Sequence, residues 1–222
     1  MFSETHEDKD IKRRGLLLIL SAPSGTGKTT LMERILQEDK HIHPSISVTT
    51  RSIRSGEKDG VNYYYTDVAT FKQMVQESKL LEHAEIFGHL YGTPKFTVEK
   101  YLNAGEDVIF DIDWQGHTQL RAISEKDVAS VFILPPSKED LLKRIRLRNQ
   151  DDEKVIKERL TLANLDINHW HEYDYVIINR NIQESVRKLM SILHSERLKK
   201  TRRTGLPVFV DNLLQQDIEH LL

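Results

Sequence analysis

A short apolar run followed by a glycine-rich loop constrains this 222-residue chain more than any other feature. Residues 16–20 are five consecutive aliphatic residues, as expected for a strand that is buried on both faces of a parallel sheet. The next eight residues, 22–29, read APSGTGKT, and a helical pattern over 27–38 follows. Such a loop between a strand and a helix is typical of phosphate binding, although Ala22 replaces the glycine that usually opens it.

Each residue type in this loop suits a nucleotide polyphosphate. Gly25 and Gly27 let backbone N–H groups point inward without Cβ clashes, at a helix N-terminus that favours anions. Lys28 places a positive charge on the β- and γ-phosphates, and the Thr29 hydroxyl is a ligand for Mg²⁺. The loop predicts phosphate binding and by itself leaves open which phosphoryl transfer follows.

The rest of the chain alternates between strands and helices. Further apolar runs indicate three more buried strands, at 108–110, 128–134 and 175–178. Helical patterns follow at 138–148, 153–170 and 182–200. Ser137 and Asp140 resemble a capping box at the first of these helices. This alternation predicts an α/β fold, with a parallel sheet flanked by helices.

The pattern changes between about 45 and 95. Residues 61–65 read as a strand, a short helix follows Asp67, and several glycines interrupt the stretch. We interpret this stretch as a small lobe inserted into a core made of 15–44 and 96–204.

The two ends of the chain are predicted to be peripheral. Residues 1–14 are polar and aperiodic, which indicates a flexible tail. Residues 205–222 form a C-terminal extension with a short helix expected over 213–222. The basic run 197–203 is interpreted as a solvated face near a helix C-terminus rather than a nucleic-acid contact.

Composition excludes several classes of protein. With 38% hydrophobic residues the chain can build a core, and 32 basic against 34 acidic residues leave no positive field for nucleic acid or an anionic membrane. The absence of cysteine excludes disulfides, thiol nucleophiles and cysteine-ligated zinc. The longest aliphatic run is too short to span a membrane, and the acidic start does not suit a signal peptide. We therefore expect a cytoplasmic protein.

Two arginines in the inserted stretch indicate a second phosphate site. The guanidinium groups of Arg51 and Arg54, together with the phenol of Tyr63, suit a phosphate separate from the one in the loop. Exposed arginines on a surface loop are the ordinary alternative. The presence of Tyr63 and Glu82 in the same stretch favours a binding site.

With these motifs in this order, the chain resembles guanylate kinase, the nucleoside monophosphate kinase that phosphorylates GMP with ATP. The resemblance covers residues 14–195, and its most specific parts are TTRSIRSGE at 49–57, YGT at 91–93 and DIDWQG at 111–116. It implies a P-loop nucleoside monophosphate kinase fold over 15–204, with a GMP-binding lobe and a lid over about 144–160. It also implies ATP and GMP as partners and Mg²⁺ as the cofactor bound with ATP, and it leaves open whether the chain forms a homo-oligomer.

The resemblance assigns roles to individual residues. It implies ATP contacts at Ala22, Pro23, Ser24, Gly25, Thr26, Gly27, Lys28, Thr29 and Asn179. It implies GMP contacts at Ser47, Arg51, Arg54, Glu57, Tyr63, Glu82, Tyr91, Thr93 and Asp113. It implies catalytic roles for Lys28, Arg51 and the lid arginines Arg144, Arg148 and Arg159. For the metal it implies Thr29, with Asp111 acting through water.

The chemistry of guanine agrees with this assignment. Guanine presents N1–H and the 2-amino group as adjacent donors, which the Glu82 carboxylate can accept together. The Ser47 and Thr93 hydroxyls can donate to O6. Adenine would place a lone pair against the carboxylate, and mismatches of this kind reach discrimination of about 10⁴–10⁵.

Two other functions remain as alternatives. A non-catalytic binding module of guanylate kinase type would generally have an eroded phosphate loop, whereas here the loop is intact. A related kinase for ribose bisphosphate would not require Glu82.

Pairs of histidines two residues apart, such as His41 and His43, are interpreted as surface residues rather than metal ligands.

Overall fold

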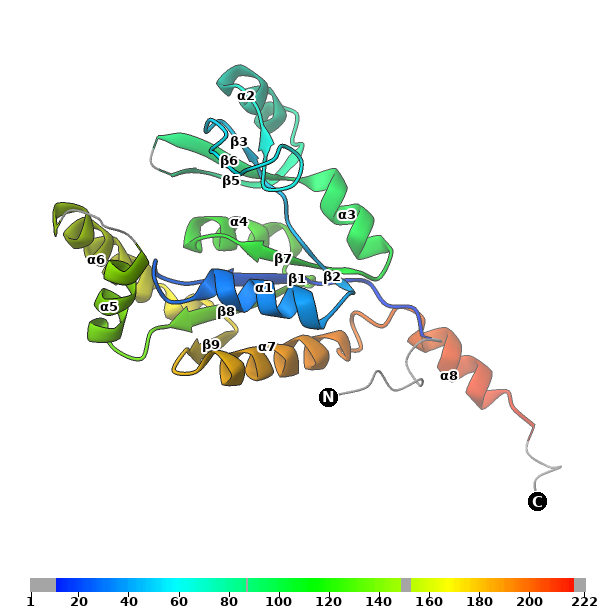
Figure 1. Cartoon of the computed structure of the whole chain (residues 1–222). Helices are drawn as coiled ribbons and strands as arrows, with labels where there is room; N and C mark the ends of the chain where they lie inside the picture. The colour runs from blue at the N-terminus through cyan, green and yellow to red at the C-terminus, as the bar shows by residue number, and fades with distance from the viewer. Residues whose placement is uncertain (1–10, 87, 149–152, 218–222) are drawn as a thin grey trace.

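The computed structural model describes residues 11–86, 88–148 and 153–217, which form a sheet-based core and a smaller lobe (Figure 1). The core sheet has the strand order β2-β7-β1-β8-β9, and its pairings are all parallel. Its strands are β1 (Leu17–Ser21), β2 (Ile42–Pro44), β7 (Asp107–Asp111), β8 (Val128–Leu134) and β9 (Tyr175–Ile178). The predicted α/β fold with a parallel sheet is confirmed.

Helices cover both faces of this sheet. They are α1 (Lys28–Glu38), α3 (Lys95–Asn103), α4 (Trp114–Ser124) and α7 (Ile182–Arg197). Leu18 and Leu20 of β1 belong to the cluster that includes α1 and α7. Leu17 and Ile19 belong to the cluster that includes α3 and α4. Because successive side chains of a strand point to opposite faces, a strand between two helical layers is apolar throughout.

The lobe contains a second sheet, with strand order β4-β3-β6-β5. Its elements are β3 (Val48–Thr49), β4 (Tyr64–Tyr65), α2 (Val68–Gln76), β5 (Leu80–Ile86) and β6 (His89–Pro94). The strand predicted over 61–65 is wrong in length, since only its last two residues belong to the sheet and Tyr63 forms an isolated bridge with Asp59. The reason is turn chemistry, because the Asn62 side chain accepts from the Lys58 N–H and holds the preceding residues in a turn.

Two helices project from the far end of the core and pack on each other (Figure 1). They are α5 (Lys138–Arg148) and α6 (Glu153–Asn168), and the short 3₁₀ turn η2 (Trp170–Glu172) leads from them into β9. Leu141 and Ile145 pack with Ile156 in a cluster separate from the main core. The predicted cap of α5 is confirmed, because the Ser137 hydroxyl accepts from the Asp140 N–H at 3.0 Å and donates to its carboxylate at 2.8 Å.

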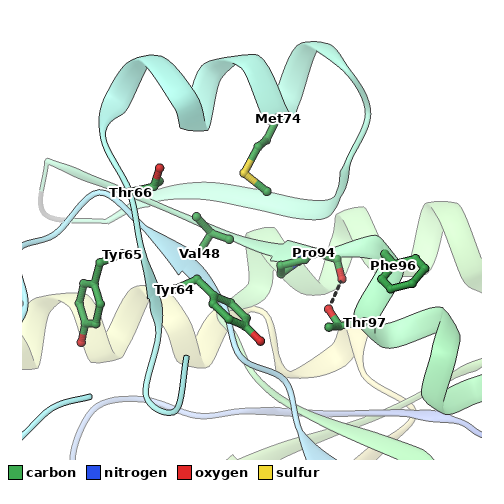
Figure 2. Close-up of a pocket in the computed structure, with 8 residues that line it drawn as sticks. All are labelled: Val48, Tyr64, Tyr65, Thr66, Met74, Pro94, Phe96 and Thr97. Atoms are coloured by element: carbon green, nitrogen blue, oxygen red, sulfur yellow. Dashed lines mark hydrogen bonds between the residues drawn. The ribbon is translucent and has the colours of Figure 1, made fainter. Parts of the chain in front are cut away.

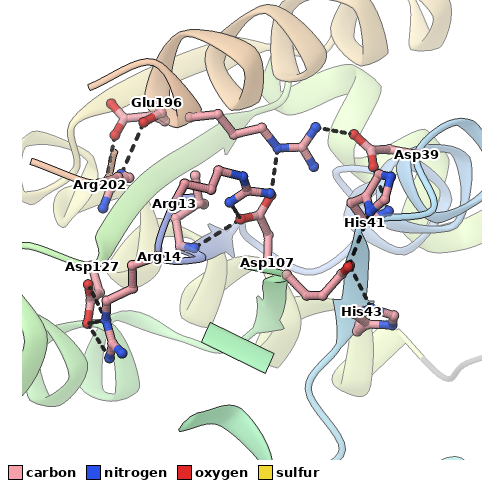
Figure 3. Close-up of polar contacts among 12 residues, drawn as sticks. Arg13, Arg14, Asp39, His41, His43, Asp107, Asp127, Glu196 and Arg202 are labelled. Atoms are coloured by element: carbon pink, nitrogen blue, oxygen red, sulfur yellow. Dashed lines mark hydrogen bonds and ion pairs between the residues drawn. The ribbon is translucent and has the colours of Figure 1, made fainter. Parts of the chain in front are cut away.

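The expected flexible tail over 1–14 is wrong for its last residues. Arg13 donates to Asp107 at 2.6 Å, and Arg14 donates to Asp127 at 2.9 Å (Figure 3). Asp107 is fully buried at the start of β7 and also accepts from Arg197 at 2.7 Å. A buried carboxylate requires such partners, and they fasten this segment to the core. Residues 1–10 lie outside the described part.

The basic run 197–203 is only in part the solvated face that was predicted, because residues 198–201 are exposed whereas Arg202 is buried. Arg202 is 2% exposed, donates to Glu196 at 2.8 Å, and also donates to the Lys126 and Val128 carbonyls. The terminal helix is also displaced from its predicted place, since α8 spans Leu206–Leu214 and projects from the core (Figure 1). The predicted range 213–222 therefore covers only the end of α8, and 218–222 lie outside the described residues. No helix in the described part has the length and apolar character needed to cross a bilayer.

Candidate active site

The phosphate loop joins β1 to α1 at the carboxyl edge of the core sheet. Gly25 and Gly27 have φ of 89° and 99°, in the left-handed region that disfavours other residues. A Cβ at Gly27 would also lie 2.8 Å from the Asn179 amide nitrogen. Gly27 begins α1 without a side-chain cap, and no acidic residue lies in the first turn. The N-terminus of α1 therefore retains the N–H groups that favour an anion.

The loop lysine and the predicted metal-binding aspartate lie together. Lys28 forms an ion pair with Asp111, which ends β7, the neighbour of β1 in the sheet. Because the carboxyl ends of parallel strands meet at one edge, residues 83 positions apart in the sequence come into contact. Thr29 follows in the first turn of α1 and is exposed, as is Asp111. A hydroxyl and a carboxylate at this edge are the oxygen donors that Mg²⁺ prefers, so the donor set fits that ion.

A network behind the loop holds its backbone. The Thr26 carbonyl accepts from the Asn179 amide at 2.8 Å and from Arg144 at 3.0 Å. Arg144 also donates to the Asn179 carbonyl at 3.1 Å, and Ser185 donates to the Asn179 side-chain oxygen at 2.9 Å. Asn179 is 3% exposed. Its side chain is therefore engaged with the loop. Sequence analysis missed Ser185, which no local pattern distinguishes from an ordinary helix residue.

The lobe holds the predicted phosphate-binding arginines on a short loop after β3. Arg51 is buried and donates to Glu57 at 2.7 Å, and its guanidinium lies 5.3 Å from the centre of the Tyr63 ring. Glu57 also accepts from the Arg54 N–H at 2.8 Å and from the Tyr65 hydroxyl at 2.7 Å. These donors lower the pKa of Glu57 to about 2, with Arg51 the largest cause. Glu57 therefore stays ionised and orients Arg51, while Arg54 is exposed.

Tyr65 is a residue of this group that sequence analysis missed. It lies two positions after Tyr63 in the run YYY, so its side chain falls on the same face of the strand. The Tyr63 ring meets those of Tyr65 and Tyr91 edge-on, at 6.1 and 5.9 Å between centres. The alternation of side chains along a strand could have identified it.

Glu82 is a buried carboxylate on β5, facing β6. It is 4% exposed, and the Thr93 hydroxyl donates to its Oε1 at 2.7 Å. Burial raises the pKa of Glu82 to about 7, and the Asp113 carboxylate adds to this while Thr93 opposes it. A Cβ at Gly116 would lie 3.1 Å from Glu82 Oε2, so the glycine leaves room beside the carboxylate. The carboxylate is costly to bury and serves no ion pair within the described residues.

Asp113 stands at the junction between the lobe and the core. Its carboxylate caps α4 by accepting from the N–H groups of Gln115 and Gly116, at 3.0 and 3.1 Å. Asp113 therefore has a structural role as the N-cap of α4. Asp113 also lies close enough to Glu82 for its charge to raise the pKa of that carboxyl group.

The remaining predicted arginines belong to the projecting helices. Arg148 ends α5, with its side chain outside the described residues, and Arg159 lies in the middle of α6. Apart from these two arginines and Asp113 at the junction, the structure gathers predicted residues into two groups, one around the loop and one in the lobe. Among the described residues, no cluster of three His, Cys, Asp or Glu side chains is arranged to hold a metal ion.

Comparison with known proteins shows to which family the chain belongs. The family model described as guanylate kinase matches residues 14–196. The chain belongs to the guanylate kinase family. It is 50% identical over 206 residues to the guanylate kinase of Nitrobacter winogradskyi, covering 93% of this chain and 94% of that protein. It is 51% identical over 204 residues to the guanylate kinase of Zymomonas mobilis, covering 92% and 94%.

A solved structure of the guanylate kinase family matches the fold as well. The crystal structure of guanylate kinase from Anaplasma phagocytophilum superposes with a TM-score of 0.76 at 33% identity, covering 93% of this chain and 99% of that one. The matched family region includes the loop, the lobe and the α5–α6 pair, and it ends before α8.

One cavity of the lobe adjoins the lobe group, because Tyr65 is one of the residues that line it. It has a volume of about 370 Å³ and opens between β3, β4, α2 and the start of α3 (Figure 2). Its lining is mostly apolar and aromatic, with Val48, Tyr64, Met74, Pro94 and Phe96. None of the residues expected to contact ATP or GMP lines it. The cavity therefore borders the lobe group at Tyr65 without including the residues expected to bind nucleotide.

Proposed function

We infer that this chain is a guanylate kinase, which transfers the γ-phosphoryl group of ATP to GMP and yields ADP and GDP. The observation that carries this inference is the buried Glu82–Thr93 pair in the lobe of a chain whose phosphate loop is intact. A buried carboxylate without a cationic partner is costly, and a ligand with two adjacent donors would satisfy it. Guanine offers such a pair of donors at N1 and N2.

The acceptor half of the proposed site recognises base and phosphate separately. Glu82 accepts from the guanine N1–H and 2-amino group, while Ser47 and Thr93 contact O6. Arg51 and Arg54 bind the GMP phosphate, with Arg51 already oriented by Glu57 at 2.7 Å. Contacts from Tyr63, Tyr91 and Asp113 complete the acceptor site. In this arrangement the phosphate, rather than a protein side chain, is the nucleophile.

The donor half of the proposed site is the loop over 22–29 with Asn179. Lys28, now paired with Asp111, moves to the β- and γ-phosphates when ATP binds. Thr29 and Asp111 would hold Mg²⁺, Asp111 through water, and the ion would neutralise phosphate charge. Asn179 and Arg144 support the loop by binding the Thr26 carbonyl. We further propose that the reaction takes place in the cytoplasm, where both nucleotides are found.

Catalysis in this proposal depends on positioning and electrostatics. The two halves hold the GMP phosphate in line with the γ-phosphorus. Arg148 and Arg159, on the proposed lid formed by α5 and α6, approach the transferred group and stabilise its charge. Closure of the lid and the lobe excludes water, which would otherwise hydrolyse ATP.

A coupled assay that follows ADP tests the function directly. GMP, AMP, CMP, UMP and ribose bisphosphate are offered as acceptors with ATP and Mg²⁺, and ATP alone measures hydrolysis. We expect rapid turnover with GMP only. Preference for ribose bisphosphate would identify the related kinase. No turnover with any acceptor, combined with GMP binding in calorimetry, would indicate a binding module.

A further inference from the structure

Two stacked ring pairs join α4 to the segment that connects α6 with β9. Trp114 stacks on His169 with ring centres 4.0 Å apart and an angle of 4° between the planes. His117 stacks on Tyr173 at 4.1 Å and 17°. Trp114 and His117 are three residues apart on α4, so their side chains share one face of that helix. The two pairs therefore form consecutive contacts along a single seam.

The connecting segment is held tightly at this seam. His169 follows the last residue of α6, and its N–H donates to the Asp166 carbonyl at 3.1 Å. Its Nδ1 lies 2.6 Å from the Glu172 carboxylate, which orients the imidazole ring. The Glu172 N–H donates back to the His169 carbonyl at 3.1 Å. The His169 ring is thus fixed on the η2 side as well as on the Trp114 side.

This seam lies between the two halves of the proposed site. Trp114 directly follows Asp113, which caps α4 beside Glu82. On the other side, Asp166 in the last turn of α6 lies close enough to Asp113 and Lys28 for their charges to affect its pKa, which burial raises. The stack therefore connects the start of α4, on the acceptor side, with the end of α6, which belongs to the proposed lid.

We propose that Trp114 and His169 are positioning residues whose stack forms the fixed pivot of the α5–α6 lid. The lid moves on the α6 side of His169, while the stack stays closed in every ligand state. The proposal rests on the guanylate kinase reaction and on the lid assignment above. It deepens both by naming the contact that sets the angle of α6 relative to the acceptor site.

Because α6 is long, a small tilt at the pivot produces a large displacement of the lid residue Arg159. Arg159 lies ten residues before His169, which corresponds to about 15 Å along a helix. A tilt of about 5° at the pivot would displace Arg159 by about 1.3 Å over that distance. Misplacement of a catalytic group by about 1 Å can lower the rate by up to about 100-fold. Loss of the stack should therefore lower kcat.

Kinetics of His169→Ala and His169→Phe separate positioning from stability. We expect His169→Ala to lower kcat by about 5- to 100-fold while KM for GMP stays within about twofold. His169→Phe keeps a planar ring against Trp114 and should recover most of kcat, although it loses the contact with Glu172. His171→Ala, at an exposed position two residues along, is the matched control. Wild-type kcat in His169→Ala, or failure of His169→Phe to recover it, would overturn the proposal.

A spectroscopic readout tests whether the stack stays closed. The chain has two tryptophans, so Trp170→Phe leaves Trp114 as the sole indole. The accessibility of Trp114 to acrylamide quenching is measured for the free protein, with GMP, with a non-hydrolysable ATP analogue, and with both. The His169→Ala variant of this protein defines the uncovered indole. We expect the same low accessibility in all four states. A rise to the His169→Ala level when both nucleotides bind would refute a fixed pivot.

The two measurements also separate this proposal from the function on which it rests. If the wild-type chain has no kinase activity with GMP, the proposed function is wrong, and the proposal that the Trp114–His169 stack positions the lid for catalysis is wrong with it. If wild-type activity is normal and the variants or the quenching contradict the expectations, the pivot fails alone.

Discussion

The substitution Glu82→Gln replaces one carboxylate oxygen with an NH2 group and leaves the size of the side chain almost unaltered. Glu82 is 4% exposed and accepts a hydrogen bond from Thr93 at 2.7 Å, and its pKa is raised to about 7 by burial. The ionised form can accept from both guanine donors, whereas glutamine offers one acceptor and turns an N–H toward the base. Glu82→Gln therefore removes one charge-assisted contact without creating a cavity.

The expected loss for GMP follows from the strength of that contact. A hydrogen bond to a charged group contributes about 1.5–3 kcal/mol, so kcat/KM for GMP should fall by about 10- to 150-fold. ATP affinity should remain unchanged, because the loop lies in the other half of the site. AMP should stay a poor acceptor, since Ser47 and Thr93 still offer donors suited to O6.

The pKa adds a pH dependence that the variant should lack. A carboxyl group with a pKa near 7 is mostly protonated at pH 6 and mostly ionised at pH 8. If only the carboxylate accepts both guanine donors, the wild-type affinity for GMP should be about tenfold weaker at pH 6 than at pH 8 through Glu82. Titration of the GMP phosphate occurs in both proteins. The difference between wild type and Glu82→Gln therefore isolates the effect of Glu82.

As pH rises, the free energy of unfolding of the wild-type protein should fall while its affinity for GMP increases. The pKa of Glu82 is about 7 in the folded state, against its ordinary value of 4.5. The folded state then holds more protons between these values, so its free energy of unfolding falls as pH rises through this window. Above pH 7 the full cost is about 3 kcal/mol. Glutamine retains an acceptor for Thr93 without this cost, so Glu82→Gln should be the more stable protein at pH 8.

Calorimetric titration with GMP and urea unfolding, each at pH 6 and pH 8, measure these effects on both proteins. Full GMP affinity in Glu82→Gln, with an unchanged dependence on pH, would refute the assignment of Glu82 as the guanine-binding carboxylate. A variant that loses stability at pH 8 would instead show that the buried carboxylate is a structural requirement of the lobe.

Three further predictions concern the loop, the lobe and the buried ion pairs. Lys28→Ala should reduce kcat by at least about 100-fold with little change in Tm, and near-normal turnover would exclude a catalytic role for Lys28. Arg51→Ala and Arg54→Ala should each weaken GMP binding much more than ATP binding, as separate titrations would measure, and equal losses would contradict the lobe assignment. Asp107→Asn should lower the free energy of unfolding by about 3–5 kcal/mol, because it removes the buried counter-charge of Arg13 and leaves Arg197 with Asp39 alone. Its kcat at a temperature where it stays folded should match wild type, since Asp107 lies at the opposite end of β7 from Asp111, and a selective loss of kcat would contradict this purely structural role.

The sequence by itself determined the α/β fold and the phosphate loop, because both depend on local patterns. An unbroken apolar strand, a loop with two glycines in left-handed conformation and a capped helix each follow from the preferences of neighbouring residues. The same reasoning missed α4, which begins with a polar turn at Asp113 and buries His117 where an apolar residue would mark the pattern. The start of α4 is set by the capping residue Asp113, which also belongs to the candidate site, and no apolar repeat marks it.

Only the tertiary structure decided which polar residues would be buried and paired. The basic run near the C-terminus reads as a solvated face, yet Arg197 reaches Asp107, 90 positions earlier in the chain, and Arg202 is buried. Glu82 likewise becomes a buried carboxylate only because β6 brings Thr93 against it. Burial and charge pairing depend on which segments meet in space, and that information is spread over the whole chain rather than held in any local pattern.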